Sequence, residues 1–182
     1  FLINGKIYFI ARRDDRIHRV YSIDLDTAKL ENVCKINGAV VQWFMLEDNI
    51  VYLTIDMSEH QELYLYNLGT EEEKKLSDNV VRYGIGVVDN KLRFITRDDD
   101  YSIYDYDLTH GIAEKVASIP GNVAFGYGKV NFTKDHVVVY TPYLRSFIVC
   151  DLKGGVNKYV LPTTVSEFVA ADSYAYTILY DD

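Results

Sequence analysis

The feature that most constrains this chain is an internal repeat. When Asp24, Asn67, Asp107 and Asp151 are placed in register, they lie 43, 40 and 44 residues apart. Each of them is followed by leucine. Apolar or aromatic residues also stand one and three positions before it and nine positions after it. Five aligned columns in four copies indicate one structural unit repeated along the chain.

The composition of the repeat is typical of β-strands. Tyr occurs 16 times, aromatic residues make up 14% of the chain and only three prolines are present. Polar and apolar residues alternate over 62–66 and 102–106, which is the period of a half-buried strand. No helical pattern extends beyond two turns. Each repeat therefore predicts four short strands, and the residues of the Asp24 column are expected to form the turns between third and fourth strands.

Four antiparallel strands repeated every 40 to 46 residues predict an all-β fold, the β-propeller, because one such sheet cannot cover both of its faces. The repeats span approximately 1–37, 38–79, 80–121, 122–164 and, in part, 165–182. About four blades are visible, and we expect them to belong to a larger propeller of six to eight blades. Two alternatives are a β-sandwich and a closed four-bladed propeller, in which 165–171 supplies the opening strand of the first repeat.

Charge and cysteine content exclude several functions. The 19 basic and 27 acidic residues give a net charge of −8, which argues against nucleic acid or an anionic membrane surface as the partner. No apolar run reaches the roughly 18 residues that a membrane span needs. Cys34 and Cys150 lie 116 residues apart, so the sequence encodes neither a disulfide framework nor a zinc cluster.

Catalytic signatures are missing from the sequence. It contains no G-x-S-x-G elbow, no H-E-x-x-H pair and no phosphate-binding P-loop. The three carboxylates at 98–100 lack the spacing of a calcium loop and are expected to form a solvated turn. We therefore expect a chain that is not an enzyme and holds no metal or cofactor.

The segments Gly5–Phe9 and Tyr21–Leu25, and again Asn90–Phe94 and Tyr104–Leu108, resemble bacterial propellers related to TolB. They are particularly similar to uncharacterised surface propellers likened to those of the low-density-lipoprotein-receptor-related proteins. The Tyr-Trp-Thr-Asp repeat of the latter is absent. Such families are mostly binding or scaffolding modules and are often exported. The resemblance thus implies an extracellular or cell-surface location and names no ligand.

Two sets of residues are candidates for binding. Loops joining second to third strands share one end of the sheets, and their charged and aromatic residues are Arg12, Arg13, Asp14, Arg97, Asp98, Asp99, Tyr143 and Arg145. Aromatic residues on the expected innermost strands, which could line a central channel, are Trp43, Tyr83 and Tyr127. We expect a binding or scaffolding module that recognises a protein, peptide or glycan. The alternatives are a gating propeller of a larger enzyme and, for the open blade edge, self-association.

Overall fold

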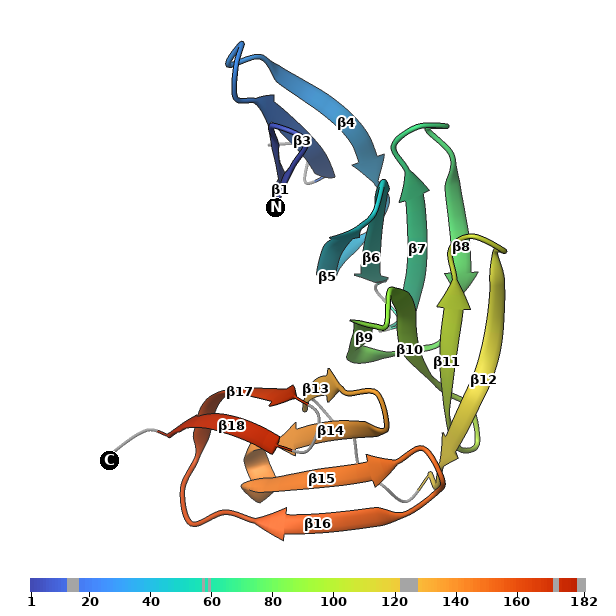
Figure 1. Ribbon diagram of the computed structural model, residues 1–182, viewed down its shortest axis with the longest axis vertical. Coiled ribbons are helices and arrows are strands. Elements are labelled where there is room, and N and C mark those ends of the chain that lie inside the picture. The colour runs from blue at the N-terminus through green and yellow to red at the C-terminus, as the bar shows by residue number, and fades with distance from the viewer. Residues whose placement is uncertain (13–16, 57, 59, 122–127, 172–173, 180–182) are drawn as a thin grey trace. The chain divides into compact units, whose positions relative to one another are not determined.

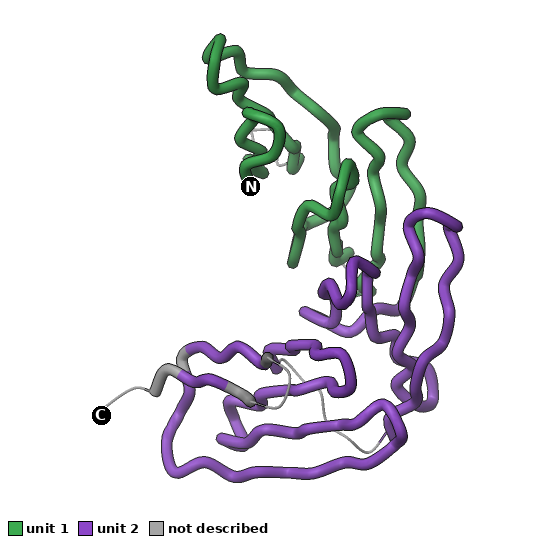
Figure 2. Tube along the Cα trace, viewed as in Figure 1, with its two compact units in different colours: residues 1–78 green, residues 79–182 purple. Residues whose placement is uncertain are grey.

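The computed structural model describes residues 1–12, 17–56, 58, 60–121, 128–171 and 174–179. These residues form β-strands and turns, with one 3-10 turn, η1, at Pro142–Leu144. The chain divides into two compact units, residues 1–78 and 79–182 (Figure 2). The expectation of an all-β chain is confirmed.

The first unit holds two four-stranded antiparallel sheets in which each strand pairs with the next along the chain (Figure 1). Sheet 1 consists of β1 (Leu2–Ile3), β2 (Lys6–Arg12), β3 (His18–Asp24) and β4 (Leu30–Ile36). Sheet 2 consists of β5 (Ala39–Leu46), β6 (Asn49–Ile55), β7 (Gln61–Asn67) and β8 (Glu73–Ser77). The two sheets share one buried cluster, which sheet 1 builds from Val20, Cys34 and Ile36 and sheet 2 from Ile50, Tyr52 and Tyr66.

The second unit repeats this arrangement. Sheet 3 consists of β9 (Val80–Val88), β10 (Lys91–Arg97), β11 (Tyr101–Asp107) and β12 (Ile112–Ile119). Sheet 4 consists of β13 (Lys129–Phe132), β14 (His136–Thr141), β15 (Ser146–Asp151) and β16 (Val156–Val160). A hairpin follows, made of β17 (Val165–Ala171) and β18 (Tyr174–Leu179).

Each face of sheet 4 is covered by a different neighbour. Val137, Val139 and Cys150 pack with Ile95 and Ile103 of sheet 3. On the opposite face, Val138, Tyr140 and Phe147 pack with Val165 and Phe168 of the hairpin. Burying apolar sheet faces against neighbouring sheets is the interaction that stabilises a propeller.

Aromatic pairs show that the repeat is also structural. Three tyrosines of one sequence column each stack on an aromatic ring of the second strand, with ring centroids 5.3–5.7 Å apart. The pairs are Phe9–Tyr21, Tyr52–Tyr64 and Phe94–Tyr104, and in each the two residues are directly opposite in the strand register. Sheet 4 has Val139 opposite Ile148 at the same place.

Gly86 illustrates how closely innermost strands approach one another. A Cβ atom at Gly86 in β9 would lie 2.7 Å from the Phe132 ring of β13. Glycine within a strand often marks the close approach of another chain segment, and here that segment is the innermost strand of the next sheet.

The structure differs from the closed four-bladed alternative. Sheet 1 has its own opening strand, since Leu2 and Ile3 pair with Ile7 and Lys6. Residues 165–171 form β17, which pairs with β18. β1 could not be predicted from the sequence, because its two residues are too few to show the alternation of a strand.

Candidate functional site

The β14–β15 loop in the second unit is a rigid turn that exposes an aromatic side chain. Pro142 begins the 3-10 turn, and Arg145 ends it in the left-handed conformation with φ 44°. The Arg145 N–H donates to the Pro142 carbonyl at 3.1 Å, and the Arg145 carbonyl accepts from the Leu161 N–H at 2.7 Å. Tyr143 is 90% exposed on this turn, and Leu144 beside it is 50% exposed.

The base of this loop is closed by a buried hydroxyl pair. Thr141 Oγ1 lies 2.9 Å from Ser146 Oγ and donates to the Ser146 carbonyl at 3.1 Å. Both side chains are buried. The turn, its base and its bond to Leu161 therefore fix the backbone that carries Tyr143 and Arg145.

The β10–β11 loop contributes the predicted charged residues of the same unit. Arg97, Asp98 and Asp99 are exposed, and the Arg97 guanidinium lies 6.0 Å from the centre of the Tyr101 ring. Asp100 has a structural role, because its carboxylate accepts the Gly121 N–H at 2.8 Å. It thereby ties the loop to the segment that leaves sheet 3.

In the first unit, only part of the predicted loop lies within the described residues. Arg12 is exposed at the end of β2 and lines a depression of about 220 Å³ with His18 and Gly38. The His18 Nδ1 atom lies 3.2 Å from the Gly38 carbonyl oxygen. Arg13 and Asp14 lie outside the described residues.

The three proposed channel residues have different surroundings. Trp43 is half-buried against the shared cluster of sheets 1 and 2, and its ring meets Phe1 edge-on with centroids 4.7 Å apart. Tyr83 has a positive φ of 60°, and the Arg82 guanidinium lies 5.2 Å from its ring centre. Tyr127 lies outside the described residues. That these residues line a channel stays a prediction.

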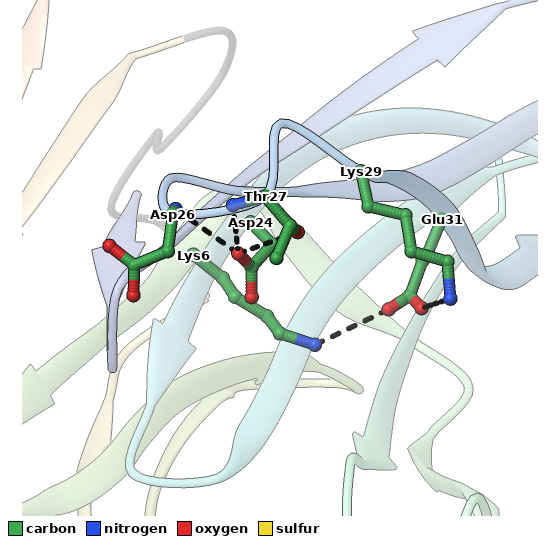
Figure 3. Close-up of polar contacts among 6 residues, drawn as sticks. All are labelled: Lys6, Asp24, Asp26, Thr27, Lys29 and Glu31. Carbon is green, nitrogen blue, oxygen red and sulfur yellow. Dashed lines mark hydrogen bonds and ion pairs between the residues drawn. The ribbon is translucent and has the colours of Figure 1, made fainter.

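The aligned Asp and Asn residues form the expected turns. Asp24 Oδ1 accepts hydrogen bonds from the N–H groups of Asp26 and Thr27 and from the Thr27 hydroxyl, at 2.8–3.1 Å (Figure 3). These bonds stabilise the carboxylate, so the pKa of Asp24 falls below its usual value, with the Thr27 N–H as the largest cause. In the other three turns the Oδ1 atom of the aligned residue likewise accepts two backbone N–H groups. Asn67 accepts from Gly69 and Thr70, Asp107 from Thr109 and His110, and Asp151 from Lys153 and Gly155.

A polar groove of about 540 Å³ lies next to the first of these turns and was not predicted. Glu31 of β4 pairs with Lys29 at 2.8 Å and with Lys6 of β2 at 3.3 Å (Figure 3). These contacts, chiefly the one with Lys29, lower the pKa of Glu31. Tyr8 and Tyr66 also line the groove. No local sequence pattern could reveal it, because its residues come from separate strands of two sheets.

The described part of the chain contains no group of three or more His, Cys, Asp or Glu residues placed to hold a metal ion. Within that same part, no helix is long and apolar enough to cross a lipid bilayer.

Comparison of the sequence with protein-family models and with curated proteins gives no match. Solved structures do match. The β-propeller domain of the Trilobed protease from Pyrococcus furiosus is 13% identical over 98% of this chain and 61% of that chain, with a TM-score of 0.62. TolB from Acinetobacter baumannii is 17% identical over 90% of this chain and 42% of that chain, with a TM-score of 0.53. An oligogalacturonate lyase in complex with manganese is 14% identical over 90% of this chain and 52% of that chain, with a TM-score of 0.65.

The chain therefore spans between two fifths and about three fifths of the structures it matches. At these identities the likeness concerns the fold alone, which TolB shares with a domain of a protease and with a lyase. Together with the four-stranded antiparallel sheets, it shows that this chain has a β-propeller fold of the kind found in TolB.

Proposed function

We propose that the chain is a non-catalytic binding module that recognises a protein or peptide partner through the loops joining second to third strands. One observation carries the proposal: Tyr143 is 90% exposed on a turn whose backbone is already fixed. A loop whose backbone is ordered before binding loses little backbone conformational entropy in a complex, and a tyrosine side chain has only two rotatable bonds to fix. Tyr and Arg are also the residues most enriched in the energetic centres of protein interfaces.

The charges beside Tyr143 support a polar, specific partner. Arg145 is exposed on the same turn, and the β10–β11 loop of the same unit exposes Arg97, Asp98 and Asp99. Exposed charges of both signs contribute mainly to orientation and to the rate of encounter. A glycan is the other ligand class that such a surface could serve. The extracellular or cell-surface location expected from the resemblance belongs to this proposal.

A second candidate function is a gating propeller within a larger enzyme. It is favoured by the likeness to the propeller domain of the Trilobed protease, of which this chain covers 61%. The same loops would then contact the catalytic domain of the longer protein. Sequence that adjoins this segment in its gene would decide between the two functions.

The proposal is tested by screening the 182-residue chain against peptide and glycan arrays and measuring the affinity of each hit. The variant Tyr143→Ser is compared with Ile112→Ser, which removes a 62% exposed apolar side chain from the first residue of β12. We expect Tyr143→Ser to weaken peptide binding by about tenfold or more, while Ile112→Ser binds normally. The proposal is wrong if the bound ligand is insensitive to Tyr143→Ser. It also fails if only glycans bind, or if the chain itself turns over a substrate.

A further inference from the structure

The outermost strand of sheet 4, β16, differs from the outermost strands of the other sheets. All five of its residues are exposed, and Val156, Tyr159 and Val160 are 40%, 56% and 72% exposed. Its only charged residue is Lys158. The other outermost strands each carry two or three charges of both signs: Glu31 and Lys35 in β4, Glu73, Lys74 and Lys75 in β8, and Glu114 and Lys115 in β12.

A second difference lies in the strand register. The pairs β3–β4, β7–β8 and β11–β12 each contain a register shift of the β-bulge type. The pair β15–β16 runs without a shift from Ser146–Val160 to Cys150–Val156. Charged side chains and bulges are the devices with which proteins protect exposed sheet edges from pairing with another chain. The edge at β16 has no bulge and a single charge.

The hydrogen bonds at the two ends of β16 show which backbone groups face outward. The Leu161 N–H donates to the Arg145 carbonyl, and the Gly155 carbonyl accepts from the Asp151 N–H. Residues 155 and 161 therefore point toward β15. Backbone groups alternate in direction along an antiparallel strand, so those of Val156, Lys158 and Val160 point away from the sheet, where a further strand can bond to them.

We propose that β16 binds an extended acidic segment of a partner protein, which pairs with it as a fifth strand of sheet 4. Backbone hydrogen bonds supply affinity in this mode of recognition, and side chains supply specificity. The charged side chains on and flanking β16 are those of Arg145, Lys153 and Lys158, which are exposed, and of Asp151. The Asp151 carboxylate already accepts the N–H groups of Lys153 and Gly155. The edge is thus locally basic in a chain of net charge −8.

The same charges disfavour a second copy of this chain as the occupant. Two β16 strands related by a two-fold axis would pair antiparallel, so that Val156 lies opposite Val160 and Lys158 lies opposite Lys158. Like charges directly opposite in a sheet are destabilising, whereas a glutamate opposite Lys158 is favourable.

This inference rests on the proposed function and names its partner class. The end of β16 meets the loop that carries Tyr143, because Leu161 bonds to Arg145. A segment paired with β16 can therefore reach that loop.

The test uses the 182-residue chain and two labelled seven-residue peptides, one alternating valine with glutamate and the other valine with lysine. We expect the glutamate peptide to bind more tightly and to shift the NMR amide signals of Val156, Lys158 and Val160. Lys158→Pro removes one outward N–H and no bond to β15, a change that edge strands tolerate. It should weaken binding of the glutamate peptide by about tenfold or more, because it removes one backbone hydrogen bond and also the charge of Lys158. Lys75→Pro in β8 is the matched control and should leave binding unchanged.

A second variant does not alter the backbone. Lys158→Glu should reverse the preference, so that the lysine peptide binds more tightly than the glutamate peptide. The inference is wrong if neither peptide binds, if Lys158→Pro binds as well as the unaltered chain, or if sedimentation shows a dimer formed through β16. If the β16 experiments contradict the inference but binding of a partner still depends on Tyr143, the proposed function stands. If peptides bind at β16 but no partner depends on Tyr143, the loop proposal fails instead.

Discussion

Arg93 is a buried charged residue at a position where the other three sheets have Tyr8, Val51 and Val138. It is 4% exposed in β10 and forms a two-bonded ion pair with Asp105, at 2.6 and 2.8 Å. Its remaining guanidinium nitrogen donates to the carbonyls of Thr133 and Lys134, which follow β13 in sheet 4. The corresponding cross-strand pairs carry no charge: Tyr8–Ser22 in sheet 1, Val51–Leu65 in sheet 2 and Val138–Val149 in sheet 4. Arg93 therefore fastens sheet 3 to sheet 4 with polar bonds.

Removing only one partner of this pair leaves a charge with little access to water. We expect Arg93→Val to lower the free energy of unfolding by about 3 kcal/mol. The double variant Arg93→Val, Asp105→Leu copies the apolar pair Val51–Leu65 of sheet 2 and should be more stable than Arg93→Val. Urea unfolding of the unaltered chain, the single variants Arg93→Val and Asp105→Leu, and the double variant forms a double-mutant cycle. If the double variant is the least stable of the four, the expectation that an apolar pair can replace the Arg93–Asp105 ion pair is wrong.

At the scale of elements, the strands could be predicted from the sequence and the contacts between sheets could not. Alternation over 62–66 and the aligned columns predicted β7 and its equivalents, because strand period and turn residues are local properties. The buried state of Arg93 depends on carbonyl groups about 40 residues away. The three strand pairs equivalent to β15–β16 each contain a bulge. No residue of 156–160 indicates that β15–β16 lacks one. Among the candidate site residues, the place of Tyr143 in a loop could be predicted from the sequence. The 3-10 turn that fixes the backbone of this loop could be learned only from the structure.

The turns between third and fourth strands provide a test at the same scale. In the Asp107 turn, bonds from His110 and the N–H of Thr109 lower the pKa of the Asp107 carboxyl below 3.8. Asn67 makes the equivalent backbone bonds through an amide oxygen. Asp107→Ala should therefore lower the urea midpoint of unfolding near neutral pH. Asp107→Asn retains the backbone bonds and should lower this midpoint by less.

The pH dependence of this difference follows from the direction of the pKa shift. A carboxyl whose pKa is lower in the folded state stabilises the fold above its unfolded pKa, and this contribution is lost as the pH falls through the folded pKa. The deficit of Asp107→Ala should accordingly shrink below pH 3.8, the ordinary value for this carboxyl. Equal midpoints for the Ala and Asn variants at pH 7 would show that the turn does not depend on these bonds.

At the scale of the whole molecule, one apolar row of sheet 1 is exposed where the aligned residues of the other sheets are buried. Ile7, Ile50, Leu92 and Val137 occupy the same place, each opposite the residue before the aligned Asp or Asn. The last three are 0% exposed, whereas Ile7 is 39% exposed. Leu2 and Leu30 extend this uncovered row across sheet 1, at 65% and 59% exposed. In sheets 2 and 4 the equivalent residues, Ile50 and Val137, belong to buried clusters shared with sheets 1 and 3. The row in sheet 1 is instead exposed apolar area that is available for association.

The 182-residue chain should consequently self-associate through sheet 1 as its concentration rises. Ile7→Glu places a charge in the centre of the row, and burying it without a partner is costly. We expect this variant to raise the dissociation constant by about tenfold or more in sedimentation velocity experiments. Ile112→Glu, which adds the same charge at an exposed position of β12, is the control and should associate like the unaltered chain. Equal dissociation constants for both variants would place the contact on another surface. A loss of association with Ile7→Glu alone would show that the exposed apolar row of sheet 1 forms the contact.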